Sequence, residues 1–430
     1  MSLRYPVPAF DLFNVYFERI YDPSMHVILT FDGVIDATVL QEATMRLIAS
    51  NPYLRSRFAD EGDDLPTWEE VEEREWVRAF SFIPTGEGVH LPPPPLDVRA
   101  GPQIRVSLYR RSGGDLVAVT CHHGFCDASG AIAVAREIFS VYRGLMTDAD
   151  YQLTPADLYD RSTGRILALY SEEEQKKALE EEEPFVDRWR FPAERVGRGI
   201  PRIASRTLAP ERLRRMKAFG REHGATVNDL LIAAFFLAFQ KIQSDPSDRG
   251  APRSILTSVD LRRRYPGCCD GAGPMNLSTA YAVTLSIGEG AGLKEAIGQV
   301  IAITSRRKTE RPGLAAILFY EGIMAGGMSA VRAFFDEMME RYLSSGCKNP
   351  VFANFGIFDP EDYLPVPGKD GSMLDITDIQ YLPCVCWPYG FLMTASTFRD
   401  RLTIMTAYEE GPYSTATVER FLEYVDGYLP

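Results

Sequence analysis

The chain has 430 residues, of which 45% are hydrophobic, and this is enough material for the cores of two domains of ordinary size. Its formal net charge of −13 disfavours nucleic acid as a partner. No apolar run approaches the ~20 residues of a membrane span and the N-terminus has no apolar signal core, so we expect a cytoplasmic protein without a membrane span.

The first half begins with alternating strand and helix patterns. Residues 26–32 alternate as a strand does, and a helix with one apolar face is predicted from Asp36. A short strand over 54–58 follows. Residues 104–109 and 116–120, joined across Gly113-Gly114, are typical of a hairpin.

The second hairpin strand leads into residues 121–130, Cys-His-His-Gly-Phe-Cys-Asp-Ala-Ser-Gly, and a helix is predicted after them over 131–145. Successive side chains of a strand point to opposite faces, which argues against a metal site built from His122, His123 and Asp127. One imidazole should face a cleft and the other the packing. An imidazole in a cleft is a natural general base at neutral pH.

From about residue 147 to 199 the chain changes character. Glu172–Glu174 and Glu180–Glu183 are charge runs, which usually mark solvated helices or linkers. We therefore expect an N-terminal lobe over 1–175, an acidic connecting segment over 176–199 and a C-terminal lobe over 200–430.

The second half alternates helices and strands. A helix is predicted from Pro210 to about residue 223, and Thr226 to Asp229 has the pattern of a capping box before an apolar helix. Later elements are expected at residues 254–259 (strand), 391–397 with 401–408 (hairpin) and 415–428 (helix).

The motif resembles the signature of the chloramphenicol-acetyltransferase-like superfamily, His-His-x-x-x-Asp-Gly. Residues 122–127 match it, and Ala128 replaces the usual glycine, so the turn must avoid positive φ at that position. The superfamily includes condensation domains, alcohol acetyltransferases and polyketide-associated acyltransferases. Pro52 to Phe58, Gly224 to Leu231 and the strand over 351–356 are similar to other parts of the family.

The resemblance implies the fold and the roles of several residues. It implies two α/β lobes, each a mixed β-sheet with flanking helices, and a tunnel between them with His123 as general base near its middle. His122 would orient the backbone, and Asp127 would be a structural anchor paired with an arginine. Arg262 is the candidate partner, with Arg55 and Arg57 as competitors, while Asn354 and Gly356 would support the cleft.

The implied activity is that of an acyltransferase. An acyl group would move from a thioester of coenzyme A or of a phosphopantetheine on an acyl carrier protein to the hydroxyl or amine of a small-molecule acceptor. We expect no tightly bound cofactor, no metal and a monomer. A basic cluster could bind a donor phosphate, and an exposed helix end is an equal alternative; the cluster comprises Arg306, Arg307, Lys308 and Arg311.

Three alternatives remain open. The first is a standalone condensation enzyme that forms amides from carrier-bound substrates. The second is a catalytically inactive binding protein of the same fold, which the replacement at Ala128 keeps possible. The third is nucleophilic catalysis by Cys121 or Cys126, for which no separate orienting acid is apparent. The seven irregularly spaced cysteines otherwise indicate reduced thiols.

Overall fold

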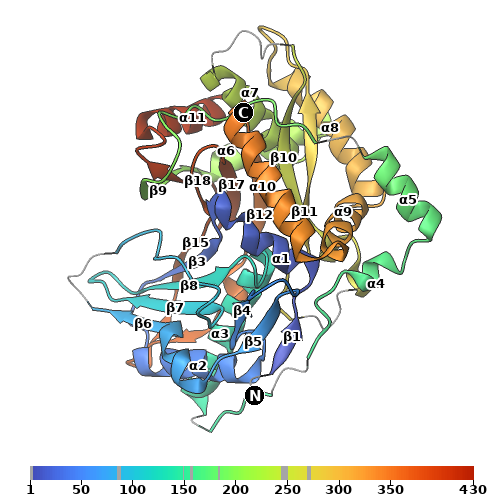
Figure 1. The fold of residues 1–430 in the computed structure, drawn as a ribbon. Coiled ribbons are helices and arrows are strands. Elements are labelled where there is room, and N and C mark those ends of the chain that lie inside the picture. Colours follow the sequence, from blue (N-terminus) through green and yellow to red (C-terminus); the bar gives the residue numbers. More distant parts are fainter. Residues whose placement is uncertain are drawn as a thin grey trace.

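Two mixed β-sheets organise the chain, one in each lobe (Figure 1). The computed structural model describes residues 3–84, 89–148, 150–154, 158–182, 185–243, 250–268 and 273–430. The expected architecture is confirmed: two α/β lobes, each with a mixed β-sheet and flanking helices, lie against each other, the first in the lower half of Figure 1 and the second in the upper half.

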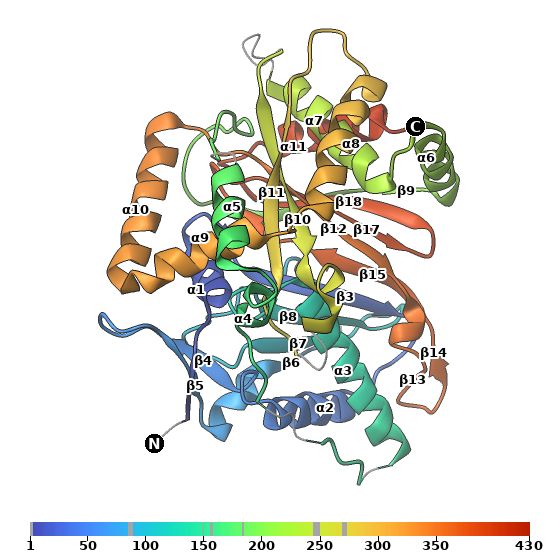
Figure 2. The same cartoon turned by 90° about the vertical axis from the view of Figure 1, so that its right-hand side faces the viewer.

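The first lobe contains a five-stranded sheet in the order β15-β3-β8-β7-β6, with β6 parallel to β7 and the other pairs antiparallel. Helices α2 and α3 pack together on it (Figure 2). A small sheet, β1-β5-β4, lies beside it. The bounds are β1 (Arg4–Pro6), β3 (Ser24–Phe31), α2 (Ala37–Ser50), β4 (Ser56–Ala59), β5 (Thr67–Glu70), β6 (Phe80–Ile83), β7 (Ile104–Tyr109), β8 (Leu116–His122) and α3 (Ala128–Thr147).

Strand β8, which delivers the motif, is central in this sheet and every one of its residues is buried. Its run of mainly apolar residues suits a strand that is covered on both faces, because neither face needs polar side chains. The expected hairpin is present as β7–β8, and its register places Ile104 opposite Cys121. The motif turn therefore begins from a rigid, fully packed strand.

The second lobe contains an eight-stranded sheet in the order β11-β10-β12-β17-β18-β16-β2, and β9 pairs with β18. Helices α6, α7, α8 and α11 cover one face (Figure 1). Helix α7 is buried continuously from Asp229 to Phe239, as its apolar run requires. The bounds are β9 (Ile200–Leu208), α6 (Pro210–His223), α7 (Val227–Gln243), β10 (Arg253–Asp260), β11 (Ser278–Leu285), α8 (Leu293–Thr309), β12 (Val351–Phe358), β16 (Val385–Cys386), β17 (Leu392–Phe398), β18 (Arg401–Glu410) and α11 (Thr415–Tyr428).

The lobes exchange strands. Strand β15 (Ile376–Leu382) comes from the C-terminal half and pairs with β3, while β2 (Tyr21–Asp22) comes from the N-terminal half and pairs with β16. The expected division into 1–175 and 200–430 does not include this exchange. The two β-sheets thus hold both halves of the chain around one junction.

Three helices lie at the junction: α1 (Ala9–Tyr16), α9 (Leu314–Ala325) and α10 (Gly327–Ser345). Phe13 of α1 packs against Tyr320 of α9 and Phe335 of α10, with ring centroids 4.4 and 5.5 Å apart. Within the described ranges, no single helix is long and apolar enough to cross a membrane. Two pairs of consecutive helices reach that length and composition only when the two helices are taken together. These pairs are α6 with α7, bent by 98°, and α9 with α10, bent by 119°.

The connecting region contains α4 (Gly164–Leu167) and α5 (Glu172–Glu181), which packs beside α9 (Figure 2). Trp189 and Phe191 follow, and both are buried in the core of the second lobe. The last part of the expected segment 176–199 is therefore anchored by aromatic side chains, and its acidic part faces the basic end of α8.

Candidate active site

The motif turn opens into a cavity of about 530 Å³ between the lobes. His123, Asp127 and Ala128 line it from the first lobe, and β10, β11 and β12 line it from the second. Aromatic side chains of α1 and the junction form much of the remaining wall, among them Phe10, Phe13, Phe17, Tyr320 and Tyr381. The cavity is mainly apolar with a few polar groups, which is the usual character of a small-molecule site.

His123 is half-buried at the end of β8 and lines this cavity. Burial lowers the pKa of its imidazole, and this outweighs its own carbonyl, Asp127, Asn276 and Asp11, all of which raise it. The ring is therefore neutral at pH 7 and can accept a proton. Its Nδ1 atom is buried and has no hydrogen-bond partner of ordinary geometry among the described residues.

His122 points the other way, into the packing, and is 1% exposed. Its Nδ1 atom accepts a hydrogen bond from the backbone N–H of Gly124 at 3.0 Å. Burial lowers the pKa of this imidazole to about 3, with His123 a smaller cause, so the ring stays neutral. His122 thus shapes the turn from inside the lobe, and the alternation of the strand separates the two histidines.

Asp127 caps helix α3 and ties the turn to the second lobe. Its Oδ1 atom accepts from the N–H of Gly130 at 3.0 Å. Its Oδ2 atom accepts from Nη1 of Arg262, from the N–H of Leu277 and from the hydroxyl of Ser278, each at 2.8 Å. The pKa of this carboxyl is lowered: burial alone would raise it, but Arg262 and the backbone donors prevail.

Arg262, offered by the sequence as the partner of Asp127, also donates from Nη2 to the carbonyl of Met275 at 2.7 Å. The competing arginines pair elsewhere, Arg55 with Glu70 at 2.9 Å and Arg57 with Glu69 at 2.7 Å. The ion pair is a bridge between lobes, because Asp127 caps α3 of the first lobe and Arg262 follows β10 of the second.

Ala128 is the first residue of α3, and its φ is not positive. As the first helical residue after the cap, it adopts a backbone conformation that alanine takes readily. The expectation that this turn avoids positive φ at position 128 is confirmed, so the replacement of glycine imposes no backbone strain there.

The two motif cysteines lie in the core of the first lobe, both fully buried. Neither belongs to the cavity wall. Burial raises the pKa of the Cys126 thiol well above its usual range, which disfavours the thiolate that a nucleophile needs. This arrangement gives no support to the alternative of nucleophilic catalysis by Cys121 or Cys126.

Asn354 and Gly356 lie on the cavity wall where β12 has a bulge. The Oδ1 atom of Asn354 accepts from the N–H of Gly356 at 3.0 Å, and Nδ2 donates to Asn228 at 3.1 Å. Gly356 has φ +80, a conformation that favours glycine. The bulge turns this part of the wall toward the cavity.

The basic cluster at the end of α8 divides into residues with different neighbours. Arg307 pairs with Glu182 at 2.6 Å, and Arg311 with Glu181, so the acidic α5 region neutralises both. Arg306 is exposed. Lys308 alone of the four lines the cavity, 3.8 Å from Asp229.

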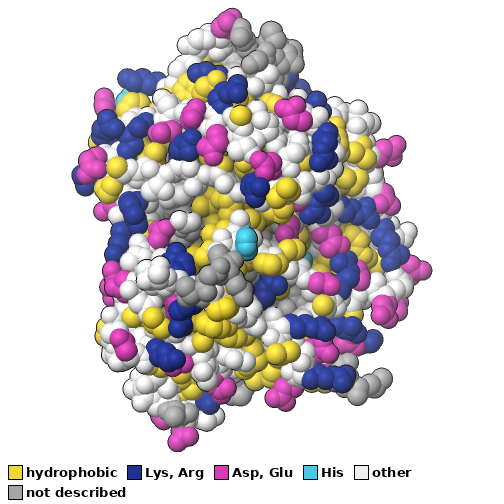
Figure 3. Space-filling model, turned by 90° about the vertical axis from the view of Figure 1, so that its left-hand side faces the viewer, with side chains coloured by type: hydrophobic (Ala, Val, Ile, Leu, Met, Phe, Trp, Pro, Cys, Tyr) yellow, Lys and Arg dark blue, Asp and Glu magenta, His cyan; other side chains and the backbone are white. Residues whose placement is uncertain are grey.

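Two further arginines, Arg263 and Arg264, also line the cavity. They were not predicted as site residues, because their position depends on the turn after β10. On the face shown in Figure 3, basic and acidic side chains are intermixed and a hydrophobic band crosses the middle.

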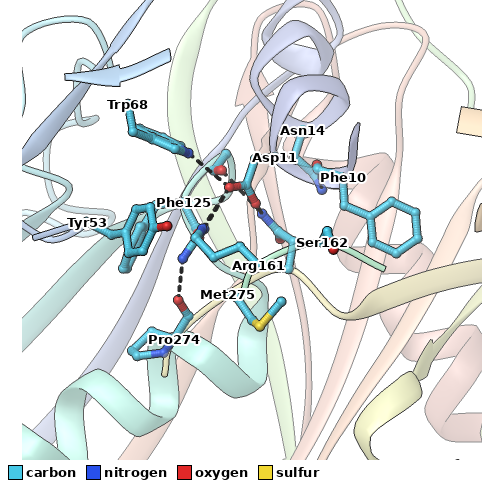
Figure 4. Close-up of polar contacts among 12 residues, drawn as sticks. Phe10, Asp11, Asn14, Tyr53, Trp68, Phe125, Arg161, Ser162, Pro274 and Met275 are labelled. Atoms are coloured by element: carbon cyan, nitrogen blue, oxygen red, sulfur yellow. Dashed lines mark hydrogen bonds and ion pairs between the residues drawn. The ribbon is translucent and has the colours of Figure 1, made fainter. Parts of the chain in front are cut away.

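A buried charge cluster lies behind the motif turn, and it was not predicted from the sequence. Asp11 and Arg161 are 1% and 4% exposed, with Nη2 of Arg161 donating to Oδ2 of Asp11 at 2.8 Å. In Figure 4 the guanidinium lies between this carboxylate and the carbonyl of Pro274, to which Nη1 donates at 2.6 Å. Trp68 donates to the same carboxylate at 3.0 Å. Arg161 also donates to the carbonyl of Phe125 in the motif turn.

A sequence model of the condensation-domain family matches residues 16–247, more than half of the chain. The chain is also 23% identical over 261 residues to the phthiocerol/phthiodiolone dimycocerosyl transferase of Mycobacterium leprae. That match covers 56% of this chain and 59% of the mycobacterial protein.

Solved structures with the same fold include three proteins. The polyketide synthase associated protein 5 of Mycobacterium tuberculosis has a TM-score of 0.68 at 18% identity, covering 98% of each chain. The trichothecene 15-O-acetyltransferase of Fusarium sporotrichioides has 0.70 at 16% identity, covering 100% of this chain and 94% of that one. The first condensation domain of the calcium-dependent antibiotic synthetase has 0.65 at 17% identity, covering 98% and 95%.

Proposed function

The chain belongs to the condensation-domain family, and from this premise we propose that it is an acyltransferase that uses His123 as general base. The donor is the thioester of coenzyme A or of a carrier-bound phosphopantetheine, and the acceptor is a small molecule with a hydroxyl or an amine. The observation that carries the proposal is a neutral imidazole on the wall of a largely apolar cavity between two lobes.

The reaction joins two bound molecules without a covalent enzyme intermediate. The acceptor oxygen or nitrogen attacks the thioester carbonyl carbon while His123 takes its proton. The C–S bond then breaks, and the imidazolium returns the proton to the departing thiolate, so the products are the ester or amide and a free thiol. The cavity contributes by holding the two reactants in reacting geometry, which is worth a large part of the barrier in such reactions.

The donor phosphate is proposed to bind where Arg263, Arg264 and Lys308 line the cavity. This refines the expectation from the sequence, because Arg307 and Arg311 are engaged by α5. Guanidinium groups suit phosphate recognition because they form paired, charge-assisted hydrogen bonds. The apolar wall around Phe13 and Tyr320 would take the acyl chain or an apolar part of the acceptor.

The test is a panel of acyl thioesters, as coenzyme A esters and as carrier-bound forms, incubated with pooled alcohols or pooled amines. Free-thiol release and mass spectrometry of the acyl product are the readouts. Thiol release that depends on both an acceptor and His123 supports the proposal. Binding of thioesters without any transfer would contradict it and favour the inactive binding protein.

The same panel separates the condensation alternative. Amide products formed only from carrier-bound thioesters would identify a condensation enzyme, whereas ester formation from coenzyme A thioesters would identify an acyltransferase with a free donor.

Arg263→Glu and Arg264→Glu test the phosphate site, with Arg420→Glu on the exposed surface of α11 as a matched reversal. With coenzyme A, one reversal should raise KM at least about tenfold, through lost direct hydrogen bonds. With a carrier, each reversal should have a small effect that depends steeply on salt. If neither reversal changes KM beyond the effect of Arg420→Glu, the donor phosphate binds elsewhere.

A further inference from the structure

We propose that Lys348 binds a carboxylate of the substrate at one end of the cavity, so that one of the two reactants carries a single negative charge there. That reactant is either an acceptor that is a hydroxy or amino acid, or a thioester whose acyl group ends in a carboxylate. The part of this inference that concerns transfer rests on the proposed function. The binding of the carboxylate can be measured without any transfer.

Lys348 is a buried cation on the wall of the cavity. Only 9% of its side chain is exposed, and its Nζ atom lies 3.9 Å from Oδ1 of Asp187. That separation is longer than a hydrogen bond, and no hydrogen bond of ordinary geometry joins Nζ to any of the described residues. Burial lowers the pKa of the lysine, but Tyr342 and Asp187 raise it by more, so the ammonium is charged at pH 7. A buried ammonium is stable only with acceptors for its hydrogens, and a ligand anion supplies one here.

Two aromatic rings hold this ammonium in position. Its Nζ atom lies 5.1 Å from the ring centre of Tyr342 and 5.6 Å from that of Phe185. Such cation–π contacts stabilise a charge without a carboxylate or carbonyl acceptor for its hydrogens. The ammonium of Lys348 is therefore placed by the rings and keeps its N–H groups for an acceptor.

The ion pair with Asp187 is not what fastens this part of the chain, because the neighbouring Asn349 already does so. The side chain of Asn349 donates to the carbonyl of Val186 at 2.8 Å and accepts from the N–H of Arg188 at 3.0 Å. Its backbone N–H donates to Oδ1 of Asp187 at 2.7 Å. The ammonium of Lys348 adds no hydrogen bond to this set, which leaves it available for a ligand.

The charges around Lys348 suit a carboxylate better than a phosphate. Lysine presents one point charge, without the fork of donors by which arginine recognises a phosphate. The buried carboxylate of Asp187 would repel a second negative charge on the ligand. A ligand group with one negative charge is therefore favoured.

Apolar and uncharged side chains surround this end of the cavity. Val351 begins β12 three residues after Lys348, and it pairs with Leu392 of β17. Close to Leu392, a Cβ atom on Gly390 would be 3.9 Å from the Cβ of Cys386. All of these residues line the cavity. The body of the ligand that carries the carboxylate is therefore expected to be apolar.

Strand β12 separates this site from the proposed phosphate site. Lys348 lies just before Val351, whereas Arg263 lies beside Gly356, because a Cβ atom on that glycine would be 3.9 Å from Nη2 of the arginine. Five residues of strand, from Val351 to Gly356, span roughly 15 Å. Lys348 and Arg263 therefore lie toward opposite ends of this wall and cannot share one small anion.

The wall beside Lys348 also leads to the general base. Cys386 of β16 pairs with Tyr21 of β2, and both residues line the cavity. Just after β2, the carbonyl of Pro23 accepts from the N–H of His123 at 2.8 Å. A reactant whose carboxylate is held by Lys348 can thus extend past Tyr21 toward His123.

The test compares each carboxylate with a neutral twin in equilibrium binding, measured by isothermal titration calorimetry. One series pairs coenzyme A thioesters of ω-carboxyacyl groups of graded length with plain acyl thioesters of the same length. The other series pairs hydroxy and amino acids with their methyl esters. The wild-type protein should bind the carboxylate more tightly in one series, and that series identifies the reactant. No preference in either series would overturn the proposal.

Lys348→Met removes the charge and keeps an apolar stem. It should weaken binding of the preferred carboxylate at least about tenfold and affect the neutral twin much less, because a hydrogen bond to a charged group is lost. Lys348→Arg should retain the preference. Lys217→Met is the matched control, because Lys217 pairs with Asp400 at 3.6 Å outside the cavity and its loss should leave binding unchanged. A folded Lys348→Met protein with the wild-type preference would overturn the proposal.

Asp187→Asn separates a ligand site from a structural ion pair. If Lys348 binds the ligand, Asp187→Asn should keep the preference for the carboxylate, because the ammonium remains. If Lys348 only pairs with Asp187, both Lys348→Met and Asp187→Asn should lower the Tm without changing the preference, and that result would overturn the proposal. Carboxylate binding that depends on Lys348, with no transfer from any thioester, would refute the proposed function and leave this site standing. Transfer in which Lys348→Met treats carboxylates and neutral twins as the wild type does would refute this site alone.

Discussion

Asp127→Asn removes one charge from the motif turn while keeping the size of the side chain, and we expect it to weaken the fold and the transfer rate together. Asparagine caps a helix as well as aspartate does, so the hydrogen bond from Gly130 can survive. The three donors at Oδ2, from Arg262, Leu277 and Ser278, would then face an NH₂ group that cannot accept. If the amide is flipped, its oxygen can accept from these donors, but its NH₂ group then faces the N–H of Gly130, which is also a donor.

The expected loss is about 1–3 kcal/mol, because buried donors at Oδ2 lose their acceptor, while Arg262 keeps a second carboxylate, Asp260, at 3.3 Å. Unfolding entropy scales with chain length, so in a chain of 430 residues this loss corresponds to a Tm lower by about 1–3 °C. The rate should fall at least about tenfold through displacement of His123. The pH optimum should not move, since Asp127 neither gives nor takes the transferred proton.

Differential scanning fluorimetry and thiol release measured well below the Tm provide the two readouts. Asp115→Asn is the control, because it neutralises a buried ion pair outside the cavity and should lower the Tm without lowering the rate. A variant at Asp127 with wild-type melting and no activity would make the carboxylate a participant in the chemistry. An Asp127→Asn variant with wild-type melting and wild-type rate would refute the role of Asp127 as a structural anchor.

Two further predictions concern buried groups. Burial lowers the pKa of His26 and of His122 to about 3, so these two residues bind up to two more protons in the unfolded chain than in the folded chain between pH 6.5 and 3. They should therefore make stability fall by up to ~2.7 kcal/mol per pH unit on acidification across that window, and His122→Ala should remove half of this contribution. Urea midpoints that do not change between pH 7 and pH 5 would contradict this. Cys126→Ser should lower stability by about 1–3 kcal/mol as a polar group enters the core, and transfer per folded molecule should persist. Complete loss of transfer by a folded Cys126→Ser protein would restore the nucleophile alternative.

The elements that could be predicted from the sequence are those with local signals. The hairpin strands, the capping box of Thr226 and Asp229 and the last helix over 415–428 all appear where expected. The motif also predicted His123 at the end of a strand and Asp127 in the turn that follows it. In each case the evidence lies within a few neighbouring residues, as periodicity or as a cap.

The contacts that depend on the whole fold could not be predicted in the same way. A lone aspartate in an N-terminal helix carries no sign that Arg161, distant by 150 positions, will pair with it. Likewise, nothing in the acidic run of α5 indicates that it will neutralise Arg307 and Arg311. The strand exchange of β2 and β15 could not be predicted either, because these strands acquire their partners only when the lobes meet.

The pH-dependent rate of acyl transfer by His123→Ala beside the wild type is the most direct test of His123 as general base. We expect that His123→Ala folds, binds thioester with near wild-type affinity and transfers about 10²–10⁴-fold more slowly. In the wild type the acidic limb of the rate profile should lie below pH 6.5, because burial lowers the pKa of His123 and the base is active when neutral. A folded His123→Ala protein with near wild-type rate would contradict the assignment of His123 as general base.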